Sequence, residues 1–341
     1  DVPSWRATKD VTMKADIIEE ITRIYGYDNF DIHTAVAPLY PVRPSVEKTV
    51  EDKIKDLLVK RFSLHELHSY VWSYYDELKA IGLDADGVIK LDGATNPNIE
   101  TIRRSIIPTQ LCQVKSNTSF APQFGIFEIG RAVTGIDENN LCIEKKKLGI
   151  TLYSKVTPIP VLFFALRDML EVMSDDIKHK PLTFEAKTAE FPYQHPRNLN
   201  KIFCDGVEIG EIGIVHPSVQ KKIDKKAAVV YAEIDVQAFA DIKNASITYY
   251  EPSKFPEMEI DLSFISRTFA PISTAILKAK SPLVKNVEVT DVYEDESDGT
   301  KSITTRITFA HPERTLTKEE VTEVTDKIIG SLKDKGIELK K

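Results

Sequence analysis

Residues 124–133 read Phe-Gly-Ile-Phe-Glu-Ile-Gly-Arg-Ala-Val, a run apolar enough to predict a strand in a protein core. Two charged residues, Glu128 and Arg131, interrupt this run. A carboxylate buried without a partner is costly, so we expect Glu128 either to be paired or to have a chemical role. The stretch therefore predicts a core strand that carries one acid in need of a partner.

The composition is that of an ordinary globular protein, with 42% hydrophobic and 28% charged residues. Its 341 residues leave room for two or three domains. No run is long and apolar enough to span a membrane, because charged residues break the most apolar segment, 159–173, and no signal peptide is evident. The chain begins Asp-Val-Pro without a methionine, which indicates a fragment of a longer protein.

Charge and cysteine usage restrict the classes of function. Cys112, Cys142 and Cys204 are too few and too scattered for a disulfide framework or a zinc site, so we expect a reducing compartment, the cytoplasm. The net charge of −7 argues against a general nucleic-acid binder, which is usually basic. Any contact with RNA must then come from a local patch of the surface.

A helix with an acidic face is predicted near the start of the chain. Its apolar residues follow the spacing of a buried stripe: Ile17, Ile18, Ile21, Ile24 and Tyr25. Asp16, Glu19 and Glu20 share one face, and Asp10 closely precedes the helix. Four such carboxylates suit a hard cation such as Mg²⁺. The alternative is a solvated acidic face in which Glu19 pairs with Arg23, and the spacing alone leaves both interpretations open.

The middle of the chain predicts a mainly antiparallel sheet with helices packed on it, an α+β arrangement. Pro38, Pro41 and Pro44 mark an extended linker before it, and an amphipathic helix begins near Ser45. Asp205-Gly206 between two apolar alternations is the strongest short-range signal of a hairpin. Further elements are expected in chain order: strands at 68–73, 147–153 and 228–236, the second paired with 124–133 across a turn at 135–139, and a buried helix at 158–173.

The end of the chain, after a boundary at 250–256, predicts a ferredoxin-like βαββαβ domain. Its elements are expected at 260–264, 272–280, 284–293, 302–309, 317–335 and 337–339, with an acidic loop at 294–299. Thr317 and Glu320 form a capping box at the start of the last helix. Alternation places Ser302, Thr304 and Arg306 on the free face of the sheet, opposite a buried face: Ile303, Ile307 and Phe309. Arg306 and Arg314 are the residues we expect to contact phosphates of RNA.

The whole chain resembles the phenylalanyl-tRNA synthetase β-subunit family of bacterial type. Residues 2–6, Asp10 and 15–27 are similar to the end of its small fifth domain. In that family the acids matching Asp10, Asp16, Glu19 and Glu20 are magnesium ligands at the junction with the catalytic α-subunit. The resemblance therefore favours the metal over the solvated acidic face.

The core resembles a class II aminoacyl-tRNA synthetase module that has lost its chemistry. Residues 127–131, Phe-Glu-Ile-Gly-Arg, are similar to the strand into motif 2, but Thr134 stands where the arginine that grips the ATP α-phosphate would be. No glycine-rich motif 3 follows Val215. Segments 96–108, 195–196 and 210–217 resemble later parts of the β-subunit, and 254–256, 261–264 and 314–321 its ferredoxin-fold anticodon-binding domain. This module is thus expected not to activate an amino acid.

The resemblance implies a β-subunit part with three regions. These are the end of the fifth domain with its acidic metal helix, 1–40, a catalytically degenerate synthetase-like core, 41–250, and the anticodon-binding domain, 251–341. It also implies an α2β2 heterotetramer in which the α-subunit binds ATP and attaches phenylalanine to its tRNA, while this chain serves assembly and tRNA binding and is inactive alone. Two alternatives stay open: a self-sufficient synthetase of the organellar type, and a metal-dependent hydrolase using Asp10, Asp16, Glu19 and Glu20.

Overall fold

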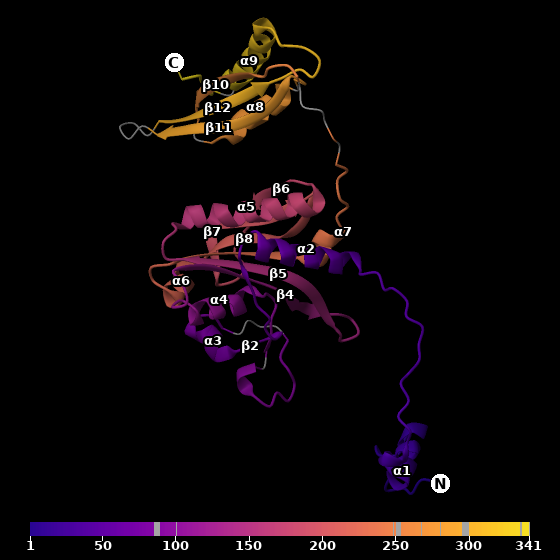
Figure 1. Ribbon diagram of the computed structural model, residues 1–341. Coiled ribbons are helices and arrows are strands. Elements are labelled where there is room, and N and C mark those ends of the chain that lie inside the picture. The colour runs from indigo at the N-terminus through magenta and orange to yellow at the C-terminus, as the bar shows by residue number, and fades with distance from the viewer. Residues whose placement is uncertain are drawn as a thin grey trace. The chain divides into compact units, whose positions relative to one another are not determined.

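The computed structural model describes residues 1–84, 89–99, 101–247, 249, 254–266, 268–279, 281–294, 300–334 and 336–340. Contacts within it divide the chain into two units, 1–245 and 246–341, each of which is described by itself (Figure 1). Most of the predicted acidic loop and of the predicted boundary segment, 295–299 and 250–253, lies outside the described residues. Within the described part of the chain, no helix is both long and apolar enough to cross a membrane.

Helix α1 (Lys14–Tyr25) forms where the apolar spacing predicts it, and a short 3₁₀ turn (Tyr27–Asn29) follows. The predicted buried stripe is wrong, because α1 buries no residue: Ile17 is 46% exposed and Ile24 is 78% exposed. An amphipathic face is buried only where another element packs on it, and among the described residues none covers this one. The proline-containing segment after it has no helix or strand before Val46.

Seven strands of the described chain form the main sheet, in the spatial order β1-β4-β5-β9-β8-β7-β6. Their bounds are β1 His65–Glu66, β4 Gln123–Ile136, β5 Cys142–Ser154, β6 Leu182–Ala186, β7 Gln194–Cys204, β8 Val207–Val215 and β9 Ala228–Asp235. All neighbours are antiparallel except the short β1 beside β4. The predicted pairing of β4 with β5 is confirmed, with Phe127 opposite Ile150. Asp205 and Gly206 turn the β7–β8 hairpin with φ of 54° and 77°, as the Asp-Gly signal predicts.

Helices cover both faces of this sheet (Figure 1). One face packs on α2 (Val46–Lys60), α5 (Ile159–Lys178) and α7 (Val236–Asp241), and the other on α3 (Tyr75–Ala80), α4 (Ile107–Ser116) and α6 (Pro217–Ile223). Helix α5 is longer than predicted and buries one side only, since Val161 and Phe164 are exposed. The strand predicted at 68–73 shrinks to β2 (Trp72–Ser73), which pairs with β3 (Thr101–Ile102) after a 3₁₀ turn at Pro97–Ile99. Because β3 has only two residues, it can form ladder hydrogen bonds with only two residues of the predicted strand.

The second unit has the predicted ferredoxin-like order. It contains β10 (Met258–Ile265), α8 (Ala270–Ala279), β11 (Val284–Glu294), β12 (Lys301–Phe309) and α9 (Lys318–Lys333). The antiparallel sheet runs β10-β12-β11, and Leu339 bridges to Phe264, which places the last segment beside β10. Ile303, Ile307 and Phe309 pack under the helices as predicted.

The predicted free face of β12 is only partly free. Thr304 and Arg306 are half-exposed, but Ser302 is 4% exposed, which contradicts the expectation from alternation. Lys340 explains the difference, because its ammonium donates to the Ser302 hydroxyl at 3.3 Å and its side chain covers that end of the strand. Burial of a strand face thus depends on long side chains from neighbouring segments as well as on the period of two.

Candidate functional site

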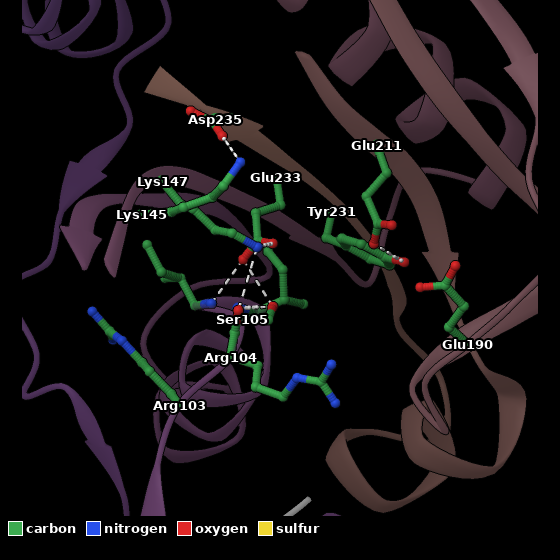
Figure 2. Close-up of polar contacts among 12 residues, drawn as sticks. Arg103, Arg104, Ser105, Lys145, Lys147, Glu190, Glu211, Tyr231, Glu233 and Asp235 are labelled. Carbon is green, nitrogen blue, oxygen red and sulfur yellow. Dashed lines mark hydrogen bonds and ion pairs between the residues drawn. The ribbon is translucent and has the colours of Figure 1, made fainter. Parts of the chain in front are cut away.

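Glu233, two residues before the end of strand β9, binds the start of helix α4. Its Oε1 accepts hydrogen bonds from the Ser105 hydroxyl at 2.8 Å and from the Ile106 backbone N–H at 2.7 Å. Its Oε2 lies 2.6 Å from Lys147 Nζ. Figure 2 shows these residues together. A carboxylate at a helix start satisfies free N–H groups and interacts favourably with the helix dipole. The network therefore ties β5, β9 and α4 together on one face of the sheet.

A second buried carboxylate, Glu211 on β8, lies on the same face. It accepts from Gln194 Nε2 at 2.7 Å and from the Tyr231 hydroxyl at 3.3 Å, and it pairs with Lys187 at 2.7 Å. Burial, with the Glu211 charge beside it, raises the pKa of Tyr231 far above its ordinary value. Tyr231 is thus a neutral hydrogen-bond donor, and Glu211, which already has three partners, is no free base for catalysis.

The acid in strand β4 has the partner that the sequence demands. Glu128 Oε1 lies 2.8 Å from Arg103 Nη2, and both side chains are 2% exposed. Ser69 donates its hydroxyl to Glu128 Oε2 at 2.7 Å. The role of Glu128 is therefore structural. Thr134, further along β4, is exposed, and its hydroxyl donates to the Ile143 carbonyl oxygen, so it offers no cation for a phosphate.

Two cavities of about 400 Å³ each open on this face of the sheet. One is mostly apolar, with walls from α3, α4 and the segment before β7, including Leu78, Phe191 and Tyr193. The other is polar, and three of its lysines are paired: Lys145 with Asp235 at 2.7 Å, and Lys147 and Lys187 with Glu233 and Glu211. Arg104, exposed in the wall of this cavity, lies over the Phe191 ring at 5.7 Å from its centroid. In the part of the chain that the structure describes, no three His, Cys, Asp or Glu side chains lie close enough to hold a metal ion. Within the described part of this face, the buried acids Glu211 and Glu233 are both paired, so neither is a free base for acyl activation.

Three of the four acids near α1 have partners of different kinds, and the fourth, Glu19, is exposed. Asp16 accepts from the backbone N–H groups of Thr12 at 2.7 Å and Met13 at 2.8 Å, which lowers its pKa. Arg6 donates to Asp10 at 2.7 Å and to Glu20 at 2.6 Å. Hydrogen bonds from Arg6, and then from Arg23, lower the pKa of Glu20 to about 2.

The structure thus brings Asp10 and Glu20 together through one guanidinium and turns Asp16 towards the start of the helix. The predicted Glu19–Arg23 pair is wrong, because Arg23 binds Glu20 at 2.8 Å instead. Oxygen donors of this kind suit Mg²⁺, but in this arrangement a cation already lies between two of the four carboxylates. As arranged here the residues do not form a coordination shell.

Both arginines predicted to meet RNA are bonded to carboxylates. Arg306 donates from Nε and Nη2 to the two oxygens of Asp261, each at 2.8 Å, which lowers the pKa of Asp261. Arg314 Nη1 donates to Glu320 Oε2 at 2.8 Å, and this pair holds the pKa of Glu320 at about 2. A phosphate would have to compete with these carboxylates for either arginine.

Sequence reasoning missed the network of Ser105, Lys147, Glu211 and Glu233. The signal was present, because Glu211 and Glu233 each interrupt an apolar strand as Glu128 does. The same rule, that a buried acid needs partners, would have found them. Their partners could not be read from the sequence, since Ser105 and Glu233 are 128 positions apart.

Comparison with known families agrees with this geometry. A family model described as the phenylalanyl-tRNA synthetase beta chain CLM domain matches residues 33–236. The ferredoxin-fold anticodon binding domain matches 253–340, and the tRNA synthetase B5 domain matches 1–27. These matches define a chain of the tRNA synthetase class. Because the first model covers more than half of it, the chain belongs to the phenylalanyl-tRNA synthetase β-chain family.

Curated relatives support the same family. The phenylalanine–tRNA ligase beta subunit of Listeria monocytogenes (strain F2365) is 28% identical over 98% of this chain, and that of Carboxydothermus hydrogenoformans is 30% identical over 98%. The Bacillus subtilis beta subunit is 27% identical over 98%. The chain spans 43%, 43% and 42% of these relatives, less than half of their length. A solved Desulfitobacterium hafniense pyrrolysyl-tRNA synthetase aligns over 59% of this chain and 73% of its own, with 15% identity and a TM-score of 0.43, a likeness too weak to argue from. Neither a self-sufficient synthetase nor a metal-dependent hydrolase gains support from these matches.

Proposed function

We propose that this chain is a non-catalytic part of phenylalanine–tRNA ligase, which serves assembly with the α-subunit and binding of phenylalanine tRNA. The observation that carries the proposal is the sheet face of the synthetase-like unit. There Glu233 and Glu211 form ion pairs with Lys147 and Lys187 of the same unit. Thr134 stands where the resemblance to a synthetase leads us to expect a phosphate-binding arginine. A module of this kind keeps the scaffold of a synthetase without the groups that would bind ATP.

The proposal extends to the whole assembly. The α-subunit would bind ATP and carry out the attachment of phenylalanine, in an α2β2 heterotetramer in the cytoplasm. The chain would contribute three regions: 1–40 at the junction with the α-subunit, 41–250 as the degenerate core, and 251–341 as the anticodon-binding domain. Family membership supports this division, and so do the three matched segments.

We further propose that Asp10, Asp16, Glu19 and Glu20 bind Mg²⁺ in the assembled enzyme. Their oxygen donors support this assignment, and Asp10 and Glu20 already converge on one positively charged group, that of Arg6. Metal binding would require Arg6 to give up these carboxylates. Glu19→Gln together with Glu20→Gln should then weaken Mg²⁺-dependent assembly, whereas Glu47→Gln, an acid on α2, should not.

Light scattering after size exclusion tests the central proposal. The chain is run alone and with the matching α-subunit, in the presence of Mg²⁺ or of a chelator. A stable complex that forms with Mg²⁺ is expected, together with ATP–pyrophosphate exchange only when the α-subunit is present. Exchange by this chain alone, or failure to form any complex while the chain is folded, would contradict the proposal.

A further inference from the structure

A patch of lysines lies at the edge of the synthetase-like unit, around helix α6. It comprises Lys115, Lys155, Lys221, Lys222, Lys225 and Lys226, and we call it the α6 lysine patch. Contacts hold it together: Lys115 Nζ donates to the Lys222 carbonyl oxygen at 2.8 Å, and Lys155 Nζ lies 3.3 Å from Asp224. The chain as a whole carries a net charge of −7, so this local excess of positive charge runs against its composition.

Four of the six lysines in this patch have no acidic partner within the described chain. Lys221, Lys222, Lys225 and Lys226 are exposed, and among the described residues none of them makes an ion pair. Asp224, the acid between them in sequence, pairs with Lys155 and not with these four lysines. It accepts from the Lys226 backbone N–H at 2.9 Å and from the Tyr153 hydroxyl at 2.9 Å. The ammonium groups are thus free to meet a polyanion.

An exposed aromatic ring borders the patch. Lys155 Nζ donates to the Thr118 carbonyl oxygen at 3.1 Å, which ties this lysine of the patch to the segment that carries Phe120, 66% exposed. The ring of Phe120 contacts those of Phe124 and His65 at centroid distances of 6.2 and 5.8 Å, so it is held at the surface rather than free to fold away. A protein binds unpaired RNA with positive charges that contact the phosphates and with aromatic rings that stack on the bases. The patch and Phe120 offer both kinds of group.

From these observations we infer that the α6 lysine patch, with Phe120, is an RNA-binding surface that contacts tRNA outside the anticodon-binding domain. The inference rests on the proposed function, because it names a site for the tRNA that function requires. It also agrees with the state of Arg306 and Arg314, whose guanidinium groups are bonded to carboxylates. Four lysines of the patch, at positions 221, 222, 225 and 226, are exposed and have no such partner in the described chain. Phosphate contacts would therefore be made where cations are free.

The test is filter binding of a labelled phenylalanine tRNA transcript to the full chain over a series of salt concentrations. Two variants remove two charges each from the patch, Lys221→Ala/Lys222→Ala and Lys225→Ala/Lys226→Ala. The matched control, Lys53→Ala/Lys243→Ala, removes two exposed lysines from the α2 and α7 side of the sheet. We expect each patch variant to lose about tenfold in affinity and to lower the log–log salt slope by about 1.5, because each phosphate contact contributes about 0.7 to 0.9 to that slope. The control should bind as the unchanged chain does.

The outcomes separate this inference from the proposed function. If the chain binds tRNA and the patch and control variants bind it equally, the patch is not the RNA site and the proposed function stands. If the unchanged chain binds no tRNA, both fail. Heparin serves as a polyanion without bases, and Phe120→Ala should weaken tRNA binding but not heparin binding. Equal losses of heparin and tRNA, with Phe120→Ala silent, would overturn RNA recognition in favour of general anion binding. Thermal melting checks that the exposed lysine changes leave the fold intact.

Discussion

Arg103 and Glu128 form an ion pair inside the synthetase-like unit, with Arg103 Nη2 2.8 Å from Glu128 Oε1 and each side chain 2% exposed. The remaining groups are bonded as well: Arg103 Nε donates to the Arg131 carbonyl oxygen at 2.9 Å, and Arg103 Nη1 donates to the Ser69 hydroxyl at 2.6 Å. Removing two charges from water is costly, so such a pair persists only when every donor and acceptor is used. It fastens β4 to the segment that leads into α4.

Glu128→Gln should strongly destabilise this unit, because it leaves the Arg103 charge buried without its counter-charge. We expect a loss of about 3 to 5 kcal/mol in the free energy of unfolding, measured by urea titration. The control lies on the same pair of strands: Glu144→Gln breaks an exposed ion pair with Arg131 and should cost less than about 1 kcal/mol. Equal losses in the free energy of unfolding for the two variants would show that the buried ion pair stabilises the fold no more than the exposed one.

The local sequence around Glu128 predicts part of this arrangement but not the residue with which Glu128 pairs. The apolar run predicts the strand, and the charge within it predicts that a partner exists. Which residue is the partner depends on tertiary structure, since Arg103 lies 25 positions away on another element. The same holds for Glu233, whose partners at Ser105 and Lys147 come from two other elements.

Glu233→Ala should loosen the start of α4. The substitution leaves the Ile106 N–H without an acceptor and Lys147 without its partner, so we expect a loss of about 3 kcal/mol. Hydrogen exchange should locate the effect, with protection lost first at the Ile106 amide. Lys145→Ala, which breaks the more exposed pair with Asp235, is the control and should leave that amide protected. An unchanged exchange rate in Glu233→Ala would argue against this anchoring role.

Gly210→Ala should disturb the pairing of β8 with β9. A β-carbon at Gly210 would lie 2.1 Å from the backbone oxygen of Glu233, and backbone cannot rotate away as a side chain can. We expect a loss of about 3 kcal/mol, seen as a lower urea midpoint. Gly135→Ala in β4 is the matched control, because its β-carbon would meet only Ile143 at an ordinary 3.7 Å. If both substitutions cost the same free energy of unfolding, the close approach of β8 to β9 is not the reason that position 210 is a glycine.

Other expectations failed where the decisive contact came from outside the local pattern. The spacing of Ile17, Ile21 and Ile24 predicts a buried stripe, yet in the described chain nothing packs on it. Alternation predicts an exposed Ser302, but Lys340, 38 positions away, covers it. Periodicity indicates which face could be buried, and tertiary structure decides whether it is.

The Arg314–Glu320 pair gives the second unit a pH-dependent stability of known sign. Hydrogen bonds from Arg314, and then from the Thr317 backbone, lower the pKa of Glu320 from 4.5 to about 2. A group whose pKa is lower in the folded state stabilises that state above its ordinary pKa. This contribution is lost as the pH falls through the folded value. Arg314→Ala should therefore raise the Glu320 pKa towards 4.5, which NMR titration of the side-chain carboxyl would detect.

Melting temperatures complete the test of this pair. The melting temperature of the unchanged chain should exceed that of Arg314→Ala by its largest amount near pH 6. This difference should shrink between about pH 4.5 and 2 and vanish below pH 2, where both forms have a protonated Glu320. Lys327→Ala breaks a pair with Glu323 on the same helix and should leave the Glu320 titration unchanged. A difference in melting temperature that persists below pH 2 would mean that Arg314 stabilises the unit by packing rather than through the charge of Glu320.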